Sequence, residues 1–228
     1  MLIAIEGALA PEQVRALRAA LLAAEDAWVD GRATAGFQGA PVKVNRQIDE
    51  GSEVARRCQE VVLAALERHP QFISAALPNA VYPPMFNRYA EGMRFGAHVD
   101  GGVRIDPRTG RKLRTDISAT LFLNDPDDYE GGELEVADTY GSHSVKLAAG
   151  DLVLYPATSL HQVTPITRGE RLASFFWVES LIRDDGQRTL LYEMDVAIQR
   201  LNRTGADEEA RRTLVGCYHN LLRQWADT

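Results

Sequence analysis

The sequence predicts an α+β fold, mainly β, in which helices at both ends flank an antiparallel sandwich or barrel. Between residues 81 and 182, short apolar or alternating runs are separated by turn residues, which is typical of antiparallel strands. Helical periodicity precedes this region and returns after residue 184. We therefore expect a β domain with N-terminal helices over residues 1–183 and a C-terminal helical extension over residues 184–228.

The N-terminal part is expected to supply helices that cover one face of the β region. Residues 2–5 (LIAI) predict a short strand, and Pro11 suits the first turn of a helix because its φ is fixed. A second helix is expected to begin after Ser52 and to end at His69 and Pro70.

The β region contains the runs MFNRY, DISATLFLN, GGELEV, HSVKL, DLVLYP, HQVTPI and RLASFFWVESLI. Each is short and bounded by turn residues, so we expect each to form or contain a strand.

Two helices are expected after residue 184, separated by NRTGADEE, with Asp207 as the cap of the second. The first helix carries apolar side chains at helical spacing, namely Leu190, Met194, Ala197 and Leu201. The pair would pack against the β core or against a second subunit of a homo-oligomer.

Composition excludes several classes of partner. The formal net charge is −7 and the pI about 5.3, with no basic tract, so neither nucleic acid nor an anionic membrane surface is an expected partner. No apolar run reaches the roughly 20 residues of a membrane span, and the N-terminus does not resemble a signal peptide. Cys58 and Cys217 lie in helical patterns and are expected to fill the core. These features predict a cytoplasmic protein.

A candidate metal site lies in FGAHVDGG, where His98 and Asp100 are two residues apart. On an extended chain, residues i and i+2 project to the same face, so both side chains can converge on one point. His161, at the start of a later expected strand, would complete the two-histidine, one-carboxylate set that holds non-haem Fe(II) and leaves coordination positions open. The alternative is that His98 and Asp100 are unrelated polar loop residues. His69 and His143 are expected to have structural or surface roles, as is His219 in the last helix.

Arg171 follows His161 by ten residues, across a segment in which Pro165 and Gly169 favour a turn. We expect the chain to return through Arg171 as a hairpin, with the guanidinium close to the metal ligands. There it would bind the far carboxylate of a dicarboxylic acid in a bidentate manner. The alternative is a surface cation paired with Glu170 or Glu179. The buried character of LASFFWV favours the first reading, because a buried arginine normally requires an anion.

Taken with their neighbours, these residues resemble the Fe(II)/2-oxoglutarate-dependent dioxygenases of the prolyl-4-hydroxylase-like group. YAEGMRFGAHVD is similar to the first metal motif of that group, and SATLFLN followed by GGEL is similar to its central strand and turn. RTDISATLFLNDPDDYEGGEL, GERLASFFWVESLIRDD and the helical tail resemble the bacterial PKHD-type hydroxylases, often described as iron-uptake-associated. The likeness covers nearly the whole chain.

The resemblance implies a double-stranded β-helix, or jelly roll. It implies that His98, Asp100 and His161 bind iron and that Arg171 binds 2-oxoglutarate, with help from the hydroxyl of Tyr89. It also implies dioxygen as co-substrate, release of succinate and CO₂, and L-ascorbate (vitamin C) as the reductant that keeps the iron in the ferrous state.

Two departures from related oxygenases follow Arg171. Many of them carry a serine two residues after the arginine, where this chain has Ala173; Ser174 would point to the opposite face. We therefore expect Ser118 or Tyr155 to contribute a hydroxyl to co-substrate binding. Relatives that demethylate nucleic acids usually carry a second arginine at the position of Trp177, which argues against a modified base as the substrate.

The predicted activity is hydroxylation of a peptidyl residue or a siderophore-like small molecule. The alternative is a non-catalytic module that binds or senses iron and 2-oxoglutarate. The segment GGVRIDPRTGRKLRT carries five cations directly after the metal motif. We expect Arg104, Arg108 and Arg111 to line the entrance and to favour an anionic substrate; the alternative is a solvated hairpin that turns at Pro107 and Gly110.

Overall fold

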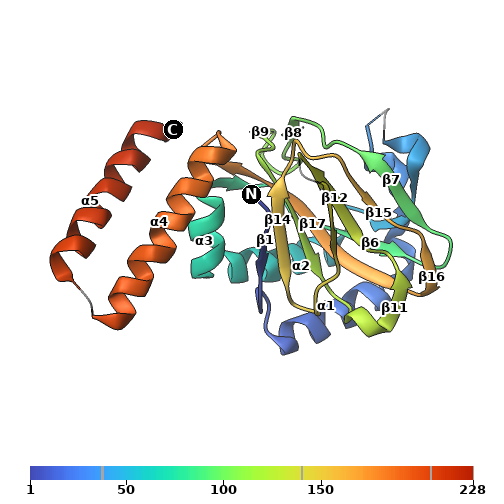
Figure 1. Cartoon of the computed structure of the whole chain (residues 1–228). Coiled ribbons are helices and arrows are strands. Elements are labelled where there is room, and N and C mark those ends of the chain that lie inside the picture. The colour runs from blue at the N-terminus through green and yellow to red at the C-terminus, as the bar shows by residue number, and fades with distance from the viewer. Residues whose placement is uncertain (37–38, 140, 206, 228) are drawn as a thin grey trace.

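Two antiparallel β-sheets form the centre of the molecule in the computed structural model, which describes residues 1–36, 39–139, 141–205 and 207–227 (Figure 1). The larger sheet has the order β1-β14-β10-β17-β6-β4-β2, with β5 also paired to β17. The smaller sheet has the order β13-β12-β15-β7-β3. Apolar side chains from both sheets, such as Phe122 and Val153 of the larger and Leu134 and Val163 of the smaller, share one interior cluster. The predicted sandwich is therefore confirmed as a jelly-roll core.

The strands of the larger sheet are β1 (Ile3–Ile5), β2 (Trp28–Asp30), β4 (Arg46–Ile48), β5 (Pro78–Val81), β6 (Met85–Tyr89), β10 (Ile117–Phe122), β14 (Leu152–Pro156) and β17 (Arg171–Ser180). Those of the smaller sheet are β3 (Lys43–Val44), β7 (Arg94–His98), β12 (Leu134–Asp138), β13 (Gly141–Val145) and β15 (His161–Val163). Two further strand pairs lie outside them. β8 (Val103–Ile105) and β9 (Lys112–Arg114) form a hairpin, whereas β11 (Tyr129–Gly131) and β16 (Ile166–Gly169) pair although they are far apart in the sequence.

The helices are α1 (Pro11–Ala23), α2 (Glu53–Leu66), α3 (Pro70–Ala76), α4 (Asp185–Thr204) and α5 (Glu208–Trp225). As predicted, α1 begins at Pro11, α2 follows Ser52, and Asp207 caps α5 by accepting a hydrogen bond from the Ala210 amide at 2.9 Å. Helix α3 was not predicted. His69 caps its start, because Nδ1 of the ring accepts a hydrogen bond from the Phe72 amide at 3.3 Å.

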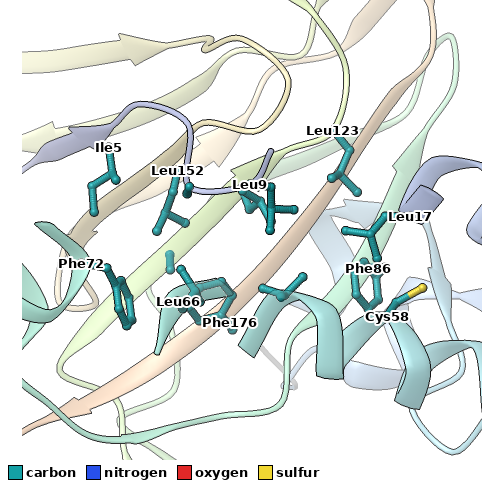
Figure 2. Packing of buried hydrophobic residues seen from close by; sticks show 14 of the residues in the cluster. Ile5, Leu9, Leu17, Cys58, Leu66, Phe72, Phe86, Leu123, Leu152 and Phe176 are labelled. Carbon is teal, nitrogen blue, oxygen red and sulfur yellow. The ribbon is translucent and has the colours of Figure 1, made fainter. Parts of the chain in front are cut away.

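Helices α1, α2 and α3 cover the outer face of the larger sheet (Figure 2). Cys58 and Leu66 of α2 and Phe72 of α3 belong to the same buried cluster as Leu152 of β14 and Phe176 of β17. Full burial of each large apolar side chain contributes about 1.5–3 kcal/mol. Successive side chains of a strand point to opposite faces, so this packing leaves the inner face of β17 for Arg171, Phe175 and Trp177.

The C-terminal helices pack together beside α3 (Figure 1). The apolar stripe predicted on α4 does not pack against the β core of its own chain: Leu190 is 55% exposed, whereas Leu191 and Ile198 are buried. A shift of one residue rotates a helical face by about 100°, and α4 turns Leu191 toward Ile182, at the end of the larger sheet. Cys217 is also exposed rather than buried, whereas Cys58 lies in the core as expected. Among the described residues, no helix combines the length and apolar character that crossing a membrane requires.

Candidate active site

Cross-strand pairing brings the two candidate histidines together. β7 and β15 are antiparallel neighbours, and His98 is the direct partner of His161 in their register. Asp100 follows the end of β7, and its oxygens lie 3.9 Å from His98 Nε2 and 3.7 Å from His161 Nε2. One potential ligand atom from each residue lies within 4.8 Å of the others. The three side chains therefore converge on one point.

Backbone carbonyls orient both imidazole rings. Nδ1 of His98 lies 2.9 Å from the Gly96 carbonyl, and Nδ1 of His161 lies 3.1 Å from the Ser159 carbonyl. A carbonyl can only accept, so Nδ1 carries the proton in each ring and the lone pair is on Nε2, the nitrogen next to Asp100. Both rings thus present an unprotonated nitrogen to a metal ion.

The neighbours of the three side chains restrict them further. Ser118 on β10 donates a hydrogen bond of 2.6 Å to Asp100 Oδ2, which joins the larger sheet to the site. The Phe95 ring stacks on the His98 ring with 3.6 Å between their centroids. Burial lowers the pKa of His98 to about 4, and the charge of His161 acts in the same direction. His98 is consequently neutral at pH 7, as a metal ligand must be.

Arg171 lies on the inner face of β17 and is only 1% exposed. The expected hairpin between His161 and Arg171 is wrong. β15 belongs to the smaller sheet and β17 to the larger, while β16 between them pairs with β11. The two residues therefore come from opposite sheets of the sandwich.

The Arg171 guanidinium lies over two aromatic rings, 5.5 Å from the centre of Tyr89 and 5.3 Å from that of Phe122. Its Nε and Nη1 have no hydrogen-bond partner among the described residues. A buried guanidinium with unused donors is costly unless an anion binds to it. The hydroxyl of Tyr129 is buried and unpartnered in the same way, and nothing in the local sequence around Tyr129 indicated this.

The turn before β12 requires glycine at Gly131 and Gly132, whose φ values are +73° and +69°. A Cβ on Gly131 would lie 2.0 Å from the Pro165 carbonyl oxygen, and one on Gly132 would lie 2.3 Å from Ile166 Cδ1 and 3.2 Å from Arg171 Cδ. Both the backbone conformation and the space exclude a side chain. The turn therefore packs directly against the arginine.

A cavity of about 90 Å³ adjoins the three converging residues. Of the other residues singled out in the sequence, Tyr89, Arg104, Ser118 and Tyr155 line it. Lys43, which the sequence analysis missed, lines it as well.

The other two candidate arginines of the hairpin bind carboxylates. Arg108 Nε lies 3.4 Å from Asp106 Oδ1, and Arg111 Nη2 donates to Glu179 at 2.8 Å.

The departures after Arg171 are visible in the strand. Ser174 is fully buried, and its hydroxyl has no partner among the described residues. Trp177 lies on the cavity side and packs edge-to-face on Tyr82, with centroids 5.5 Å apart. His143 lies outside the site: it is exposed and contacts Asp138 Oδ2 at 2.7 Å.

The donor set fits a ferrous ion. Two neutral imidazoles and one carboxylate leave further coordination positions free, whereas structural zinc sites are usually closed by four protein ligands and often by thiolates. The unused donors of Arg171 fit the distal carboxylate of a dicarboxylic acid such as 2-oxoglutarate.

Comparison with known proteins agrees with this chemistry. Residues 84–179 match the 2OG-Fe(II) oxygenase superfamily, and residues 185–227 match the PKHD-type hydroxylase C-terminal domain. The chain is 73% identical to a PKHD-type hydroxylase of Cupriavidus pinatubonensis and 57% identical to one of Caulobacter vibrioides, each over the full length of both chains. In fold it resembles a Pseudomonas putida prolyl-4-hydroxylase, with 23% identity, a TM-score of 0.53, and 78% of this chain and 92% of that one covered. It also resembles the carbocyclase SnoK from nogalamycin biosynthesis, with 16% identity, a TM-score of 0.57, and 79% and 80% of the two chains covered. The chain therefore belongs to the PKHD-type hydroxylases, Fe(II)- and 2-oxoglutarate-dependent dioxygenases of the 2OG-Fe(II) oxygenase superfamily.

Proposed function

We propose that His98, Asp100 and His161 bind the Fe(II) of this dioxygenase and that Arg171 binds the far carboxylate of 2-oxoglutarate. One observation carries the proposal: three potential ligand atoms lie within 4.8 Å of one another, in the same interior as a buried arginine with unpartnered donors. The bound iron supplies the activation of dioxygen that couples decarboxylation of 2-oxoglutarate, to succinate and CO₂, with hydroxylation of the substrate.

The protein's own part is to orient the ligands and exclude water. The Gly96 and Ser159 carbonyls hold the two rings with Nε2 directed inward. Ser118 occupies one lone pair of Asp100 Oδ2 and fixes the rotation of that carboxylate. Apolar and aromatic walls, including Phe95 and Phe175, keep the reacting atoms away from bulk solvent.

Among the candidate hydroxyls, we assign Tyr89 and Tyr155 to co-substrate binding beside Arg171. Tyr89 is the direct partner of Arg171 across β6 and β17, and burial raises its pKa to about 12, so the phenol stays a hydrogen-bond donor. Tyr155 lines the cavity, with its ring centre 5.1 Å from that of His161, and burial raises its pKa as well. Ser118 donates to Asp100, so we give it a role in holding the carboxylate instead.

The substrate that we propose is a peptidyl residue or a siderophore-like small molecule, with L-ascorbate as reductant and the cytoplasm as location. Reconstituted protein incubated with peptide and metabolite collections, followed by mass spectrometry for the addition of one oxygen, would identify it. An added oxygen that requires 2-oxoglutarate supports the proposal, whereas its appearance without 2-oxoglutarate contradicts it.

We also propose that the C-terminal extension, residues 184–228, associates with a second copy of the chain. The predicted stripe of α4 does not enter the core of its own chain, and Ala197 and Leu201 instead line a surface depression together with Tyr192 and Val196. Light scattering should give the mass of a dimer, and Leu201→Glu should shift it toward that of a monomer. A monomeric wild type would contradict this association.

Succinate formation tests the assignment of the site. Protein supplied with Fe(II), 2-oxoglutarate and dioxygen should form succinate slowly even without prime substrate. His98→Ala and His161→Ala should lose both stoichiometric iron and succinate, whereas the exposed His143→Ala should retain both. Unchanged turnover in the first two variants would refute the assignment.

A further inference from the structure

Two cations other than Arg171 line the cavity, namely Lys43 and Arg104. Arg171 and Trp177 lie six residues apart on the same face of β17, which corresponds to roughly 20 Å along a strand. The guanidinium of Arg104 lies 4.2 Å from the centre of the Trp177 ring. Lys43 and Arg104 both line the cavity next to the three candidate metal ligands. Positive charge thus lies at two separate places: at Lys43 and Arg104 in the cavity wall, and at Arg171 over the ring of Tyr89, which also lines the cavity.

Lys43 is unusual because it is a lysine with only 4% of its surface exposed. Its Nζ donates to Thr34 Oγ1 and Gln47 Oε1, both at 3.2 Å, and lies 4.9 Å from the centre of the Phe95 ring. These partners are all neutral. A buried ammonium is costly without a counter-charge, so a bound anion would stabilise the charged form of Lys43.

Arg104 extends from β8 toward the same space. Besides Trp177, it lies over the Tyr82 ring at 5.1 Å. Among the described residues, neither Arg104 nor Lys43 forms an ion pair. Three carboxylates act to raise the pKa of Lys43, in the order Asp100, Glu50 and Asp30. Asp100 is a proposed iron ligand and Asp30 is paired with Arg32, whereas Glu50 accepts a hydrogen bond from the Tyr82 hydroxyl at 3.1 Å.

The charge balance of the loaded site indicates one missing negative charge. Ferrous iron and Arg171 together carry three positive charges, which Asp100 and doubly charged 2-oxoglutarate balance. Lys43 and Arg104 remain. Because Asp100 is already counted with the iron and Asp30 is paired with Arg32, Glu50 is the counter-charge left for these two cations among the described residues. One additional monoanion would neutralise this part of the cavity. Its surroundings, which include Phe95, Phe175 and Trp177, suit an apolar body attached to that anion.

We infer that Lys43 and Arg104 form the anchor for the prime substrate, and that this substrate carries a carboxylate on an apolar or aromatic body. The inference rests on the proposed function, because it places the substrate beside the iron and the bound 2-oxoglutarate. It adds a specificity-determining residue, Lys43, that lies outside residues 84–179, the segment matching the oxygenase superfamily.

Two probes of the same shape test the anchor: benzoate, which is an anion, and benzamide, which is neutral. Protein loaded with substoichiometric Mn(II) and saturated with 2-oxoglutarate is titrated with each probe, and line broadening of the probe's ring protons by the paramagnetic ion is followed by NMR. Benzoate should bind at least about tenfold more tightly than benzamide, because only benzoate carries the negative charge that the two cations attract; tenfold corresponds to about 1.4 kcal/mol.

Three variants identify the residues responsible. Lys43→Met and Arg104→Met should each weaken benzoate binding about tenfold and leave benzamide binding and 2-oxoglutarate affinity unchanged. The control is Lys112→Met, an exposed lysine of the same hairpin as Arg104, which should behave as wild type. Melting temperatures of all three variants verify that they are folded, and Arg104, on a surface hairpin, provides a test independent of the buried Lys43.

Equal affinity for benzoate and benzamide would overturn the inference, as would loss of 2-oxoglutarate affinity in Lys43→Met, which would assign this lysine to the co-substrate. Failure of the proposed function looks different. In that case Mn(II) and 2-oxoglutarate do not bind to wild-type protein, and a preference for benzoate in the metal-free protein that depends on Lys43 and Arg104 still supports the anion site.

Discussion

The two positively charged parts of the interior differ in how they are built. Arg171 is 1% exposed, on the ten-residue strand β17 inside the larger sheet, and its neighbours Tyr89 and Phe122 come from the two adjoining strands. Lys43 and Arg104 come from β3, an edge strand of the smaller sheet, and from β8 of a separate hairpin. The part that we propose for the co-substrate is thus embedded in the core, whereas the part that we propose for the substrate is assembled from peripheral segments. Such an arrangement lets substrate preference change without disturbing co-substrate binding.

Loss of the carboxylate between the two parts should have the largest effect. Asp100→Ala removes one of three proposed ligands, and we expect metal affinity and succinate formation to fall by more than about 100-fold. Metal content after anaerobic reconstitution and succinate yield measure this directly. The matched control is Asp127→Ala, an exposed aspartate on a 3₁₀ turn, which should retain wild-type values. An Asp100→Ala protein that still binds iron stoichiometrically would place the metal elsewhere.

Arg171→Met tests the embedded part. The variant loses a charge-assisted bidentate contact, so KM for 2-oxoglutarate should rise by about 100-fold while metal affinity stays unchanged. In the absence of 2-oxoglutarate, the variant should be at least as stable as wild type, because it removes a buried cation that has no counter-charge among the described residues. Thermal unfolding with and without 2-oxoglutarate gives the second readout.

The control for this prediction is Arg168→Met, an exposed arginine paired with Glu130 at 2.9 Å. A large loss of stability in Arg171→Met without ligand, combined with unchanged KM, would mean that Arg171 has a structural role only.

The difference between local patterns and long-range assembly also explains which parts of the structure could be predicted from the sequence. Short apolar runs bounded by turn residues, such as MFNRY and RLASFFWVESLI, correctly located β6 and β17. Both strands are buried on both faces, so they are marked by an apolar run between turn residues rather than by strict alternation. His161 and Arg171 were predicted to lie on the two strands of one hairpin, but they lie on the smaller and the larger sheet respectively. A local turn pattern carries no information on which sheet a strand will join.

Lys43 illustrates the second limit. A lysine between valines, as in VKV, is typical of an ordinary edge strand with its cation in solvent. Lys43 is buried because β3 pairs with β7 beside the candidate ligands. The apolar stripe of α4 shows a related limit. The sequence predicts its apolar residues, but packing within the chain buries a neighbouring face of the helix, with Leu191 and Ile198. Residues whose role depends on long-range assembly left no periodic signal.

Ser118→Ala separates two roles for one hydroxyl. The change removes the 2.6 Å hydrogen bond to Asp100 Oδ2 with little change in volume, so metal affinity should fall about tenfold. Calorimetric titration with Mn(II) measures it, and the exposed Ser142→Ala serves as control. If instead metal affinity is unchanged and KM for 2-oxoglutarate rises, Ser118 serves the co-substrate, and our assignment of Tyr89 and Tyr155 alone is wrong.

The smallest predicted effect is a pH dependence confined to the peripheral part of the cavity. Burial lowers the pKa of Lys43 to about 8, and the charge of Arg104 lowers it further, while Asp100, Glu50 and Asp30 act in the opposite direction. Lys43 is therefore charged below about pH 8 and neutral above it, so its contribution to benzoate binding is present at low pH and lost as the pH rises through this value.

The contact with Arg104 remains when Lys43 is neutral, so the affinity for benzoate should fall by less than about tenfold. The bound anion itself favours the ammonium form, which moves the midpoint in the complex to a higher pH than in the free protein. The pH step should disappear in Lys43→Met and persist in Arg104→Met. A step of equal size in both variants would assign the titration to another group and would remove Lys43 from the anchor. The anchor would then consist of Arg104 beside Trp177.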